Sequence, residues 1–250
     1  MQPEPPARKP RRERHLVRWL FIVILAILGW YGWKAYDFQQ AVKRAEELGW
    51  EFESNDPIAI IREDWRNAFR KDTWSDTARS LSISPNDSLE DHYDLIRRLK
   101  PTQLEIWRML SLRDLSQLKG LSRLTKLTLS ECPNLTNIDA IKELKNLTDF
   151  EIIGSPALSN IDALKELKKL EHLGLSGCSA LSNVDALREL KALKYLNLDD
   201  CIGLKNVDGL QGLTQLVFLR LEFCEGLPEA SLDAVKSALP TTRFGSSIQK

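Results

Sequence analysis

The sequence predicts an α/β solenoid, with short parallel strands on the concave side and short helices or turns on the convex side. One observation behind this prediction is the even spacing of Cys132, Cys178, Cys201 and Cys224, whose positions differ by 46, 23 and 23. Ser155 fills the missing position of this series. A second observation is that leucines keep the same 23-residue step at Leu124, Leu147, Leu170, Leu193 and Leu216. A fixed period of this length is typical of a chain built from stacked coils.

Each coil is predicted to begin with a short strand that carries two apolar residues separated by one other residue. Leu127 and Leu129 are such a pair, and in a strand both side chains point to the same side, into the core. Moving this pair along the chain by the same 23-residue step predicts eight strands in one parallel sheet, near 81–83, 104–106, 127–129, 150–152, 173–175, 196–198, 219–221 and 242–244. The first and last are degenerate, which is usual for the ends of a solenoid.

The rest of each coil is predicted to turn and return along the convex side. In the first clear copy, its apolar residues are Cys132, Leu135, Ile138, Ile141 and Leu144. An aspartate recurs at positions 139, 162, 185 and 208, where it is predicted to cap a short helix. An asparagine recurs two positions earlier, where its side chain is predicted to bond the backbone of the turn. A metal site is the alternative for these columns, but a structural ladder explains them better, and we expect no metal.

The N-terminal part of the chain predicts a membrane anchor. Residues 19–33 form a run of 15 residues without charge, which spans about 22 Å as a helix. If Arg18 and Lys34 reach outward, residues 16–36 span about 31 Å, which matches the ~30 Å hydrocarbon core. The alternative is a cleaved signal peptide, but no A-x-A-like cleavage site follows the run. The sequence therefore favours one transmembrane signal anchor.

Basic residues predict the orientation of this anchor. Six precede the run, at Arg8, Lys9, Arg11, Arg12, Arg14 and Arg18. Three follow it closely, at Lys34, Lys43 and Arg44. Because positive flanks stay in the cytoplasm, the N-terminus is expected inside and the repeats outside. We therefore expect a single-pass membrane protein, in a bacterial inner membrane with the repeats on the periplasmic side.

Five segments are predicted along the chain. They are a disordered basic tail at 1–15, the anchor at 16–36, a helical juxtamembrane cap at 37–78, the repeats at 79–228 and a C-terminal cap and tail at 229–250. Within 37–78, one helix is expected over 37–48 and a second after Asp56, with Pro57 in its first turn. This second helix is expected to cover the open end of the solenoid, and a docking helix for a partner is the alternative.

The repeats resemble those of bacterial leucine-rich repeat proteins. The resemblance rests on LTKLTLSECPNLTNIDAIKELKNL, LEHLGLSGCSALSNVDALREL and LKYLNLDDCIGLKNVDGLQGL, and covers roughly residues 80–245. The IDALKEL half is similar to the internalin type, and the SxCxxL half is similar to cysteine-containing repeats. The resemblance implies a protein-binding solenoid whose partner is set by variable surface residues, and it does not extend to the anchor or to residues 37–78.

Catalysis is not expected. The only histidines are His15, His92 and His172, and no Ser/His/Asp set, phosphate-binding loop, H-E-x-x-H or C-x-x-C motif is present. The cysteines are expected to be buried free thiols, although ~4.8 Å between strands does not exclude a Cys178–Cys201 disulfide. We expect no cofactor, and the formal net charge of zero gives no reason to expect nucleic acid.

Residues beside and just after the strand leucines are predicted to face the concave side. The candidate ligand-binding residues among them are Glu105, Trp107, Arg108, Glu131, Glu151, His172, Tyr195, Asn197, Asp199, Phe218, Arg220 and Glu222. The whole face carries seven acids against three bases, and aromatic residues often dominate interfaces. The sequence therefore predicts a protein-binding scaffold whose partner has a basic, partly apolar surface. The alternative is an envelope-organising structural protein that binds glycan or assembles with itself.

Overall fold

The computed structural model describes residues 51–54, 78–83 and 89–245, with separate helical residues between Gly29 and Glu47. The predicted tail at 1–15, most of the predicted anchor, the helix predicted after Asp56 and residues 246–250 lie outside the described residues. In the part of the chain that is described, no helix has both the length and the apolar character needed to cross a bilayer.

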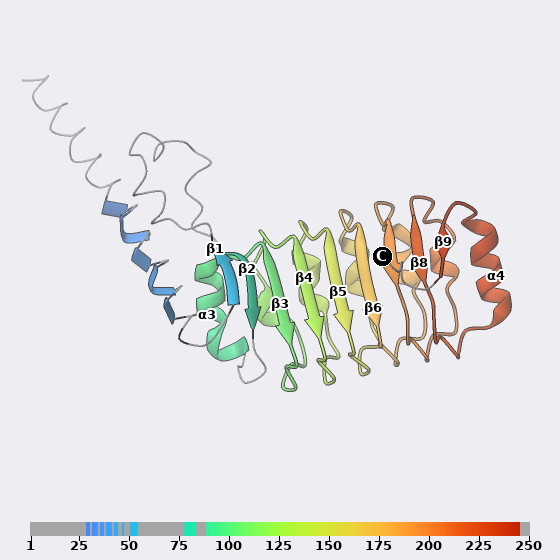
Figure 1. Ribbon diagram of the computed structural model, residues 1–250, viewed down its shortest axis with the longest axis horizontal. Coiled ribbons are helices and arrows are strands. Elements are labelled where there is room, and N and C mark those ends of the chain that lie inside the picture. Colours follow the sequence, from blue (N-terminus) through green and yellow to red (C-terminus); the bar gives the residue numbers. More distant parts are fainter. Residues whose placement is uncertain are drawn as a thin grey trace, which may run out of the picture.

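One sheet of nine strands runs through the described chain in sequence order (Figure 1). Its strands are β1 (Glu51–Ser54), β2 (Ala78–Ile83), β3 (Gln103–Trp107), β4 (Lys126–Ser130), β5 (Asp149–Ile153), β6 (His172–Ser176), β7 (Tyr195–Asn197), β8 (Phe218–Arg220) and β9 (Arg243–Phe244). From β2 to β9 every neighbouring pair is parallel, and partners such as Leu127 and Phe150 lie one repeat apart. The eight predicted parallel strands are confirmed.

The prediction missed β1. This strand pairs antiparallel with β2, in a segment that the sequence analysis assigned to a helical cap. The repeat period locates only segments that have a copy in a neighbouring coil, and Glu51–Ser54 has none. The helical residues described between Asp37 and Glu47 do agree with the helix expected over 37–48.

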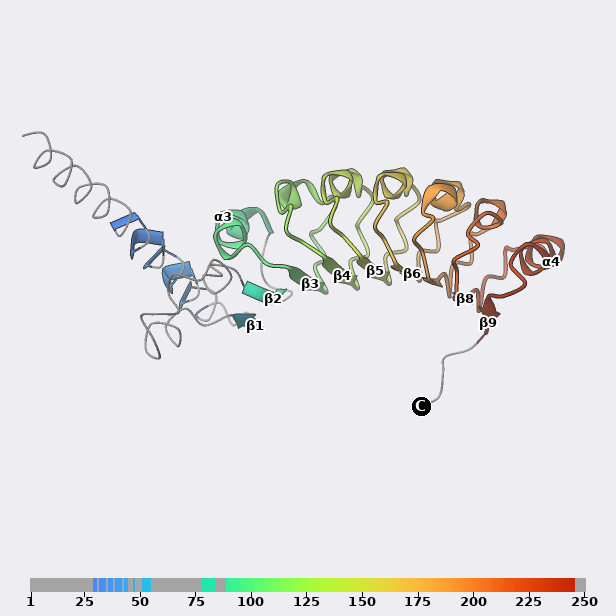
Figure 2. The same ribbon diagram turned by 90° about the horizontal axis from the view of Figure 1, so that it is seen from above.

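Short helices cover the other side of the sheet. They are the 3-10 helices η1 (Ser116–Leu118), η2 (Asp139–Glu143), η3 (Asp162–Glu166), η4 (Asp185–Glu189) and η5 (Asp208–Leu210), with the α-helices α3 (Leu89–Leu99) and α4 (Glu229–Ala238) towards the two ends. Seen along the strands, the coils form an arc with the sheet on its inner side (Figure 2). The described chain is a leucine-rich repeat solenoid, with strands on the concave side and short helices on the convex side.

The core lies between these two layers. Leu127 and Leu129 are fully buried, and so is Cys132 at the turn that follows them. Phe150 takes the place of Leu127 in the next coil and is among the largest fully buried side chains. Each coil therefore packs its apolar columns against the coils on either side, which is how a solenoid buries a continuous core.

The turns before η2, η3, η4 and η5 are held by an asparagine side chain, whereas before η1 the carboxylate of Asp114 takes that role and accepts the backbone N–H of Ser116 at 2.8 Å. Asn160 Oδ1 accepts the backbone N–H of Asp162 at 2.8 Å, and Asn137 and Asn206 make the same bond at 2.7 and 2.6 Å. The predicted aspartate caps are wrong, because each aspartate is the first residue of its helix and the cap position before it has no side-chain hydrogen bond. A capping residue lies just before the first turn and its side chain accepts a backbone N–H from within that turn, but in these four helices that position is an isoleucine or a valine, which has no acceptor.

Candidate binding site on the concave sheet

The predicted ligand-binding residues fall into three groups. One group lines a hollow on the concave face: Glu151, His172, Tyr195, Asn197, Phe218 and Arg220. Arg108 and Glu131 line a second hollow, and a third group lines neither: Glu105, Trp107, Asp199 and Glu222. Only the first group is brought together on the sheet itself.

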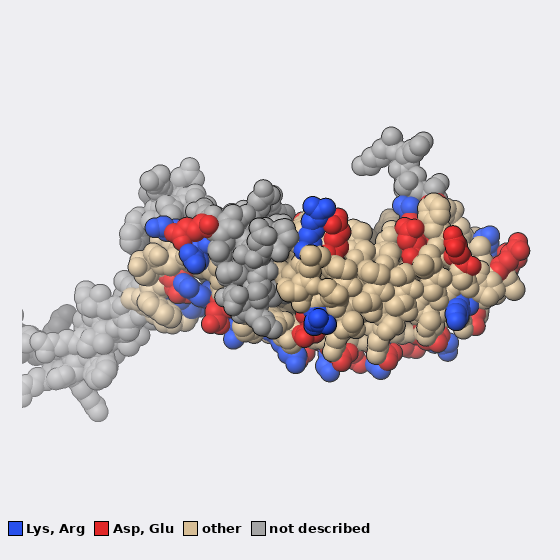
Figure 3. Space-filling model, turned by 90° about the horizontal axis from the view of Figure 1, so that it is seen from below, with Lys and Arg blue, Asp and Glu red and all other residues tan. Residues whose placement is uncertain are grey.

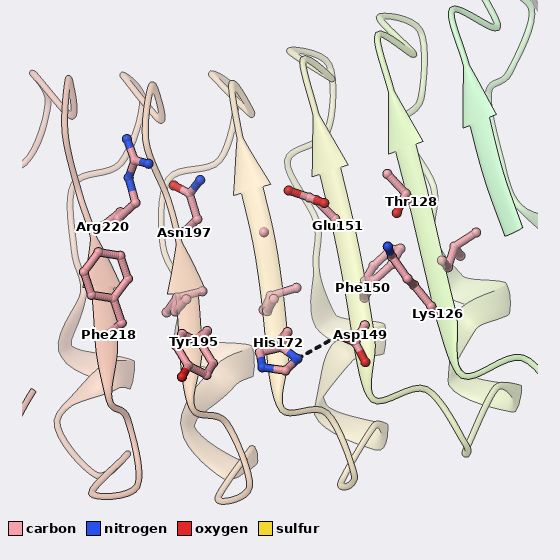
Figure 4. A pocket seen from close by; sticks show the side chains of 14 residues that line it. Lys126, Thr128, Asp149, Phe150, Glu151, His172, Tyr195, Asn197, Phe218 and Arg220 are labelled. Carbon is pink, nitrogen blue, oxygen red and sulfur yellow. Dashed lines mark hydrogen bonds and ion pairs between the residues drawn. The ribbon is translucent and has the colours of Figure 1, made fainter. Parts of the chain in front are cut away.

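The concave hollow has a volume of about 310 Å³ and crosses β4 to β8. One row of its lining consists of the first residues of successive strands, Lys126, Asp149, His172, Tyr195 and Phe218. A second row lies two positions further along, at Thr128, Glu151, Gly174, Asn197 and Arg220. Because side chains alternate along a strand, both rows project from the same face (Figure 4).

Rings occupy the part of the first row that lies on β6 to β8, at His172, Tyr195 and Phe218. The rings of His172 and Tyr195 have centroids 4.8 Å apart at an interplanar angle of 38°. His172 Nδ1 lies 2.7 Å from Asp149 Oδ1, and Thr148 Oγ1 donates to the other oxygen of Asp149, also at 2.7 Å. This carboxylate therefore fixes the imidazole, which in turn supports the half-exposed ring of Tyr195. Phe218 follows on the next strand (Figure 4).

Two bases of the concave side are held in ion pairs with acids. Arg108 Nε donates to Glu131 Oε2 at 2.7 Å, and Lys126 Nζ lies 3.8 Å from Glu105 Oε1. The hydrogen bond and charge of Glu131 raise the pKa of the Arg108 guanidinium. The first pair is well exposed and the second is partly exposed and long, so each contributes little to folding stability.

Arg220 is held by a tighter cluster. Its Nη2 atom lies 2.5 Å from Asp199 Oδ2 and 3.4 Å from Glu222 Oε2. Asp199 Oδ1 also accepts the backbone N–H of Glu222 at 2.9 Å. Asp199 is only 5% exposed. This candidate residue therefore holds the Arg220 guanidinium in place, and its own carboxylate is not accessible to a ligand.

The ion pairs of the concave side neutralise some of its acids and leave the carboxylate of Glu151 without a cation from the described part of the chain. Each base of the concave side is committed to an acid, as described above. Glu151 is in none of these pairs, and its side chain has no hydrogen-bond or ion-pair partner among the residues that the structure describes. It lines the middle of the hollow, where its carboxylate is left without a described cation.

The second hollow lies at the edge where the chain leaves the strands, and its volume is about 490 Å³. Besides Arg108 and Glu131, it is lined by Leu110, Pro133, Gly154 and Pro156. Arg108, Glu131 and Gly154 all have positive φ and begin the same tight turn in successive coils. Figure 3 shows that few charged side chains lie on this edge over the middle coils.

Sequence reasoning left some lining residues out of the candidate set. Lys126, Thr128, Asp149 and Gly174 also line the concave hollow. All four lie beside strand leucines and were therefore predicted to face the concave side, and their place one or two repeats from a chosen candidate was the signal that could have added them to the set. Leu110, Pro133 and Pro156 also lie one repeat apart, but no candidate residue belongs to their column, and the repeat pattern does not define the direction in which these turns point.

The cysteines form no reactive site. All four are free; Cys132, Cys178 and Cys201 are buried, as predicted, whereas Cys224 is only half-buried. Burial raises the pKa of Cys178 and Cys201 to about 12, which keeps both thiols neutral and unreactive at ordinary pH. No cluster of three or more metal-ligating side chains occurs among the described residues.

Comparisons with known proteins find similarity at the level of solved structures. No family model matches the chain, and no curated protein does. The leucine-rich repeat domain of the type III effector XopL is 26% identical over 60% of this chain, with a TM-score of 0.47. This chain spans 62% of that domain, which is less than two thirds of it. Internalin C2 from Listeria monocytogenes is 22% identical, covers 68% of this chain and 74% of its own, and has a TM-score of 0.48. The structure of the Rad7 and Elc1 complex in yeast is 19% identical over 66% of this chain and 48% of that one, with a TM-score of 0.47.

Proposed function

We propose that the chain is a non-catalytic scaffold that binds a partner protein across the concave hollow of β4 to β8. The observation that carries this proposal is the row of rings on β6 to β8, which lies beside an unpaired acid. Tyr195 is 42% exposed, and Phe218 is half-buried next to it. Aromatic anchors held in place by a rigid backbone are the residues that contribute most to protein interfaces.

The charge of the hollow supports a partner with a basic surface. Arg220 and Lys126 are neutralised by acids of the same face, whereas Glu151 is not neutralised by any described residue. Complementary charge favours association and fixes the register of the partner. The partner therefore presents at least one cation together with apolar groups that pack on the rings.

Photo-crosslinking in the native cell tests this proposal. A benzophenone amino acid replaces Tyr195 or Phe218, which keeps an aromatic ring in the site, and Lys168 serves as the matched position on the exposed convex side. We expect a discrete protein adduct from the two concave positions and none from Lys168. If an oligosaccharide that is present during irradiation prevents the adduct from forming, the result would support glycan binding instead. Equal yields from all three positions would contradict a concave site.

We further propose that residues 16–36 anchor the chain in a membrane, with the repeats outside the cytoplasm. The support is the uncharged run at 19–33 and the excess of basic residues before it. Protease added to intact spheroplasts should remove the repeats and leave a short membrane-bound fragment. Repeats that are digested only after the membrane is broken would contradict this orientation, and repeats released by alkaline washing would contradict the anchor.

A further inference from the structure

Glu151 and its neighbours form a subsite with a more definite chemistry than the rest of the hollow. We propose that Glu151 and Thr128 bind the charged end of one arginine or lysine side chain of the partner. This inference rests on the proposed binding function and names the group that is recognised there. Three features of the hollow support it: the position of the carboxylate, the lack of a competing cation among the described residues and an unpaired oxygen on the neighbouring strand.

The position of Glu151 is set by a glycine. Gly174 is its register partner on β6 and has no side chain to occupy the centre of the hollow. A Cβ atom added to Gly174 would lie 2.9 Å from Glu151 Cγ and 3.4 Å from Oε1. The side chain of Glu151 therefore lies across the glycine, and its carboxylate is turned towards β6 (Figure 4).

Cationic groups near Glu151 are already committed to other acids. Lys126 pairs with Glu105 on the side of β3, and Arg220 pairs with Asp199 on the side of β8. His172 contacts Asp149 through its Nδ1 atom. Within the described part of the chain, no cation is left for Glu151, so a cation from outside can bind there without first breaking an internal pair.

Thr128 supplies a second polar atom. It is the register partner of Glu151 on β4, lines the same hollow and is only 7% exposed. Its Oγ1 atom is buried and has no hydrogen-bond partner among the described residues. An ammonium group has three N–H donors and a guanidinium has five, so either can serve both the carboxylate and the hydroxyl.

The surroundings also fit a long side chain with a charged end. The rings of His172 and Tyr195 lie in the adjacent row of the hollow, within the same lining. The aliphatic part of an arginine or lysine packs well on such surfaces, and a guanidinium is attracted to the face of a tyrosine ring. An anion would be repelled by the carboxylate of Glu151, and a purely apolar group could not donate a hydrogen bond to it.

A peptide-display selection tests the subsite. The full-length chain in detergent micelles selects from a library of random peptides, alongside the E151Q and E143Q variants. Glu143 is an exposed acid of η2 on the convex side, so E143Q controls for the loss of one charge. The unaltered chain and E143Q should enrich peptides with arginine or lysine at one fixed position. E151Q should still enrich aromatic and aliphatic residues but lose that basic position.

Affinities then test the chemistry directly. One selected peptide is compared with a copy in which citrulline, the neutral isostere of arginine, replaces the basic residue. Citrulline should weaken binding to the unaltered chain about tenfold or more and change binding to E151Q little, because the charge-assisted bond is already lost there. The T128V variant should weaken binding of the arginine peptide by a smaller factor.

The possible outcomes separate the two proposals. Peptides enriched without a basic position, or a basic position that E151Q retains, would overturn the subsite and leave the binding function standing. Failure to enrich any peptide over empty micelles would contradict both. Circular dichroism of the variants establishes that each is folded as the unaltered chain is.

Discussion

Three thiols lie in one column of the core and are protected by their position. Cys201 Sγ donates to the carbonyl oxygen of Leu175 in the preceding coil at 3.1 Å, and Cys178 lies one repeat earlier in the column. Their columnar spacing made burial predictable from the sequence. The partial exposure of Cys224 was not predictable, because it depends on how the last coils close the solenoid.

This difference in burial predicts the order in which the thiols react. At pH 8, iodoacetamide should modify Cys224 before Cys178 or Cys201, whose folded pKa values of about 12 leave almost no thiolate. Because these pKa values exceed the unfolded value of 9.0, the stability that they contribute is complete below pH 9 and is lost as the pH rises towards 12. Mass spectrometry of the folded and denatured chain measures the rates, and equal rates for all the thiols of the folded chain would contradict the burial.

At the scale of single elements, the turns before the 3-10 helices depend on one side-chain bond each. Asn160 Oδ1 binds the N–H of Asp162, which is the first residue of η3. The sequence identified both columns and gave the asparagine its correct role. It gave the aspartate a wrong role, because a shift of a single position in the start of a helix decides which side chain can cap it.

A pair of substitutions separates these two roles. Asn160→Ala should lower the free energy of unfolding by about 1 kcal/mol, since it removes the acceptor for a backbone N–H. Asp162→Ala serves as the control and should lower it by less than about 0.5 kcal/mol, as is usual at an exposed surface position. Urea unfolding measures both, and a larger loss for Asp162→Ala would contradict the assignment.

At the scale of the whole molecule, the 23-residue period of the sequence predicts how the coils stack, but it does not predict which concave side chains are open to a ligand. Every strand with a copy in a neighbouring coil was predicted in its correct place, because register in the sheet equals the sequence period. The sequence could not distinguish Asp199 from Glu151, which both lie on the concave side. Only the side-chain arrangement reveals that Asp199 is covered and holds Arg220, whereas Glu151 is unpaired within the described chain.

The binding function is tested most directly by extending the photo-crosslinking to a scan of the whole solenoid. Benzophenone is placed in turn at one concave and one convex position of each coil from β3 to β8, in the full-length chain and in its native cell. We predict that one protein is captured from the concave positions, with the highest yield at β6 to β8, where the rings lie. Capture from the convex positions alone, or from neither side, would contradict the proposal that the inner face of this solenoid binds a partner.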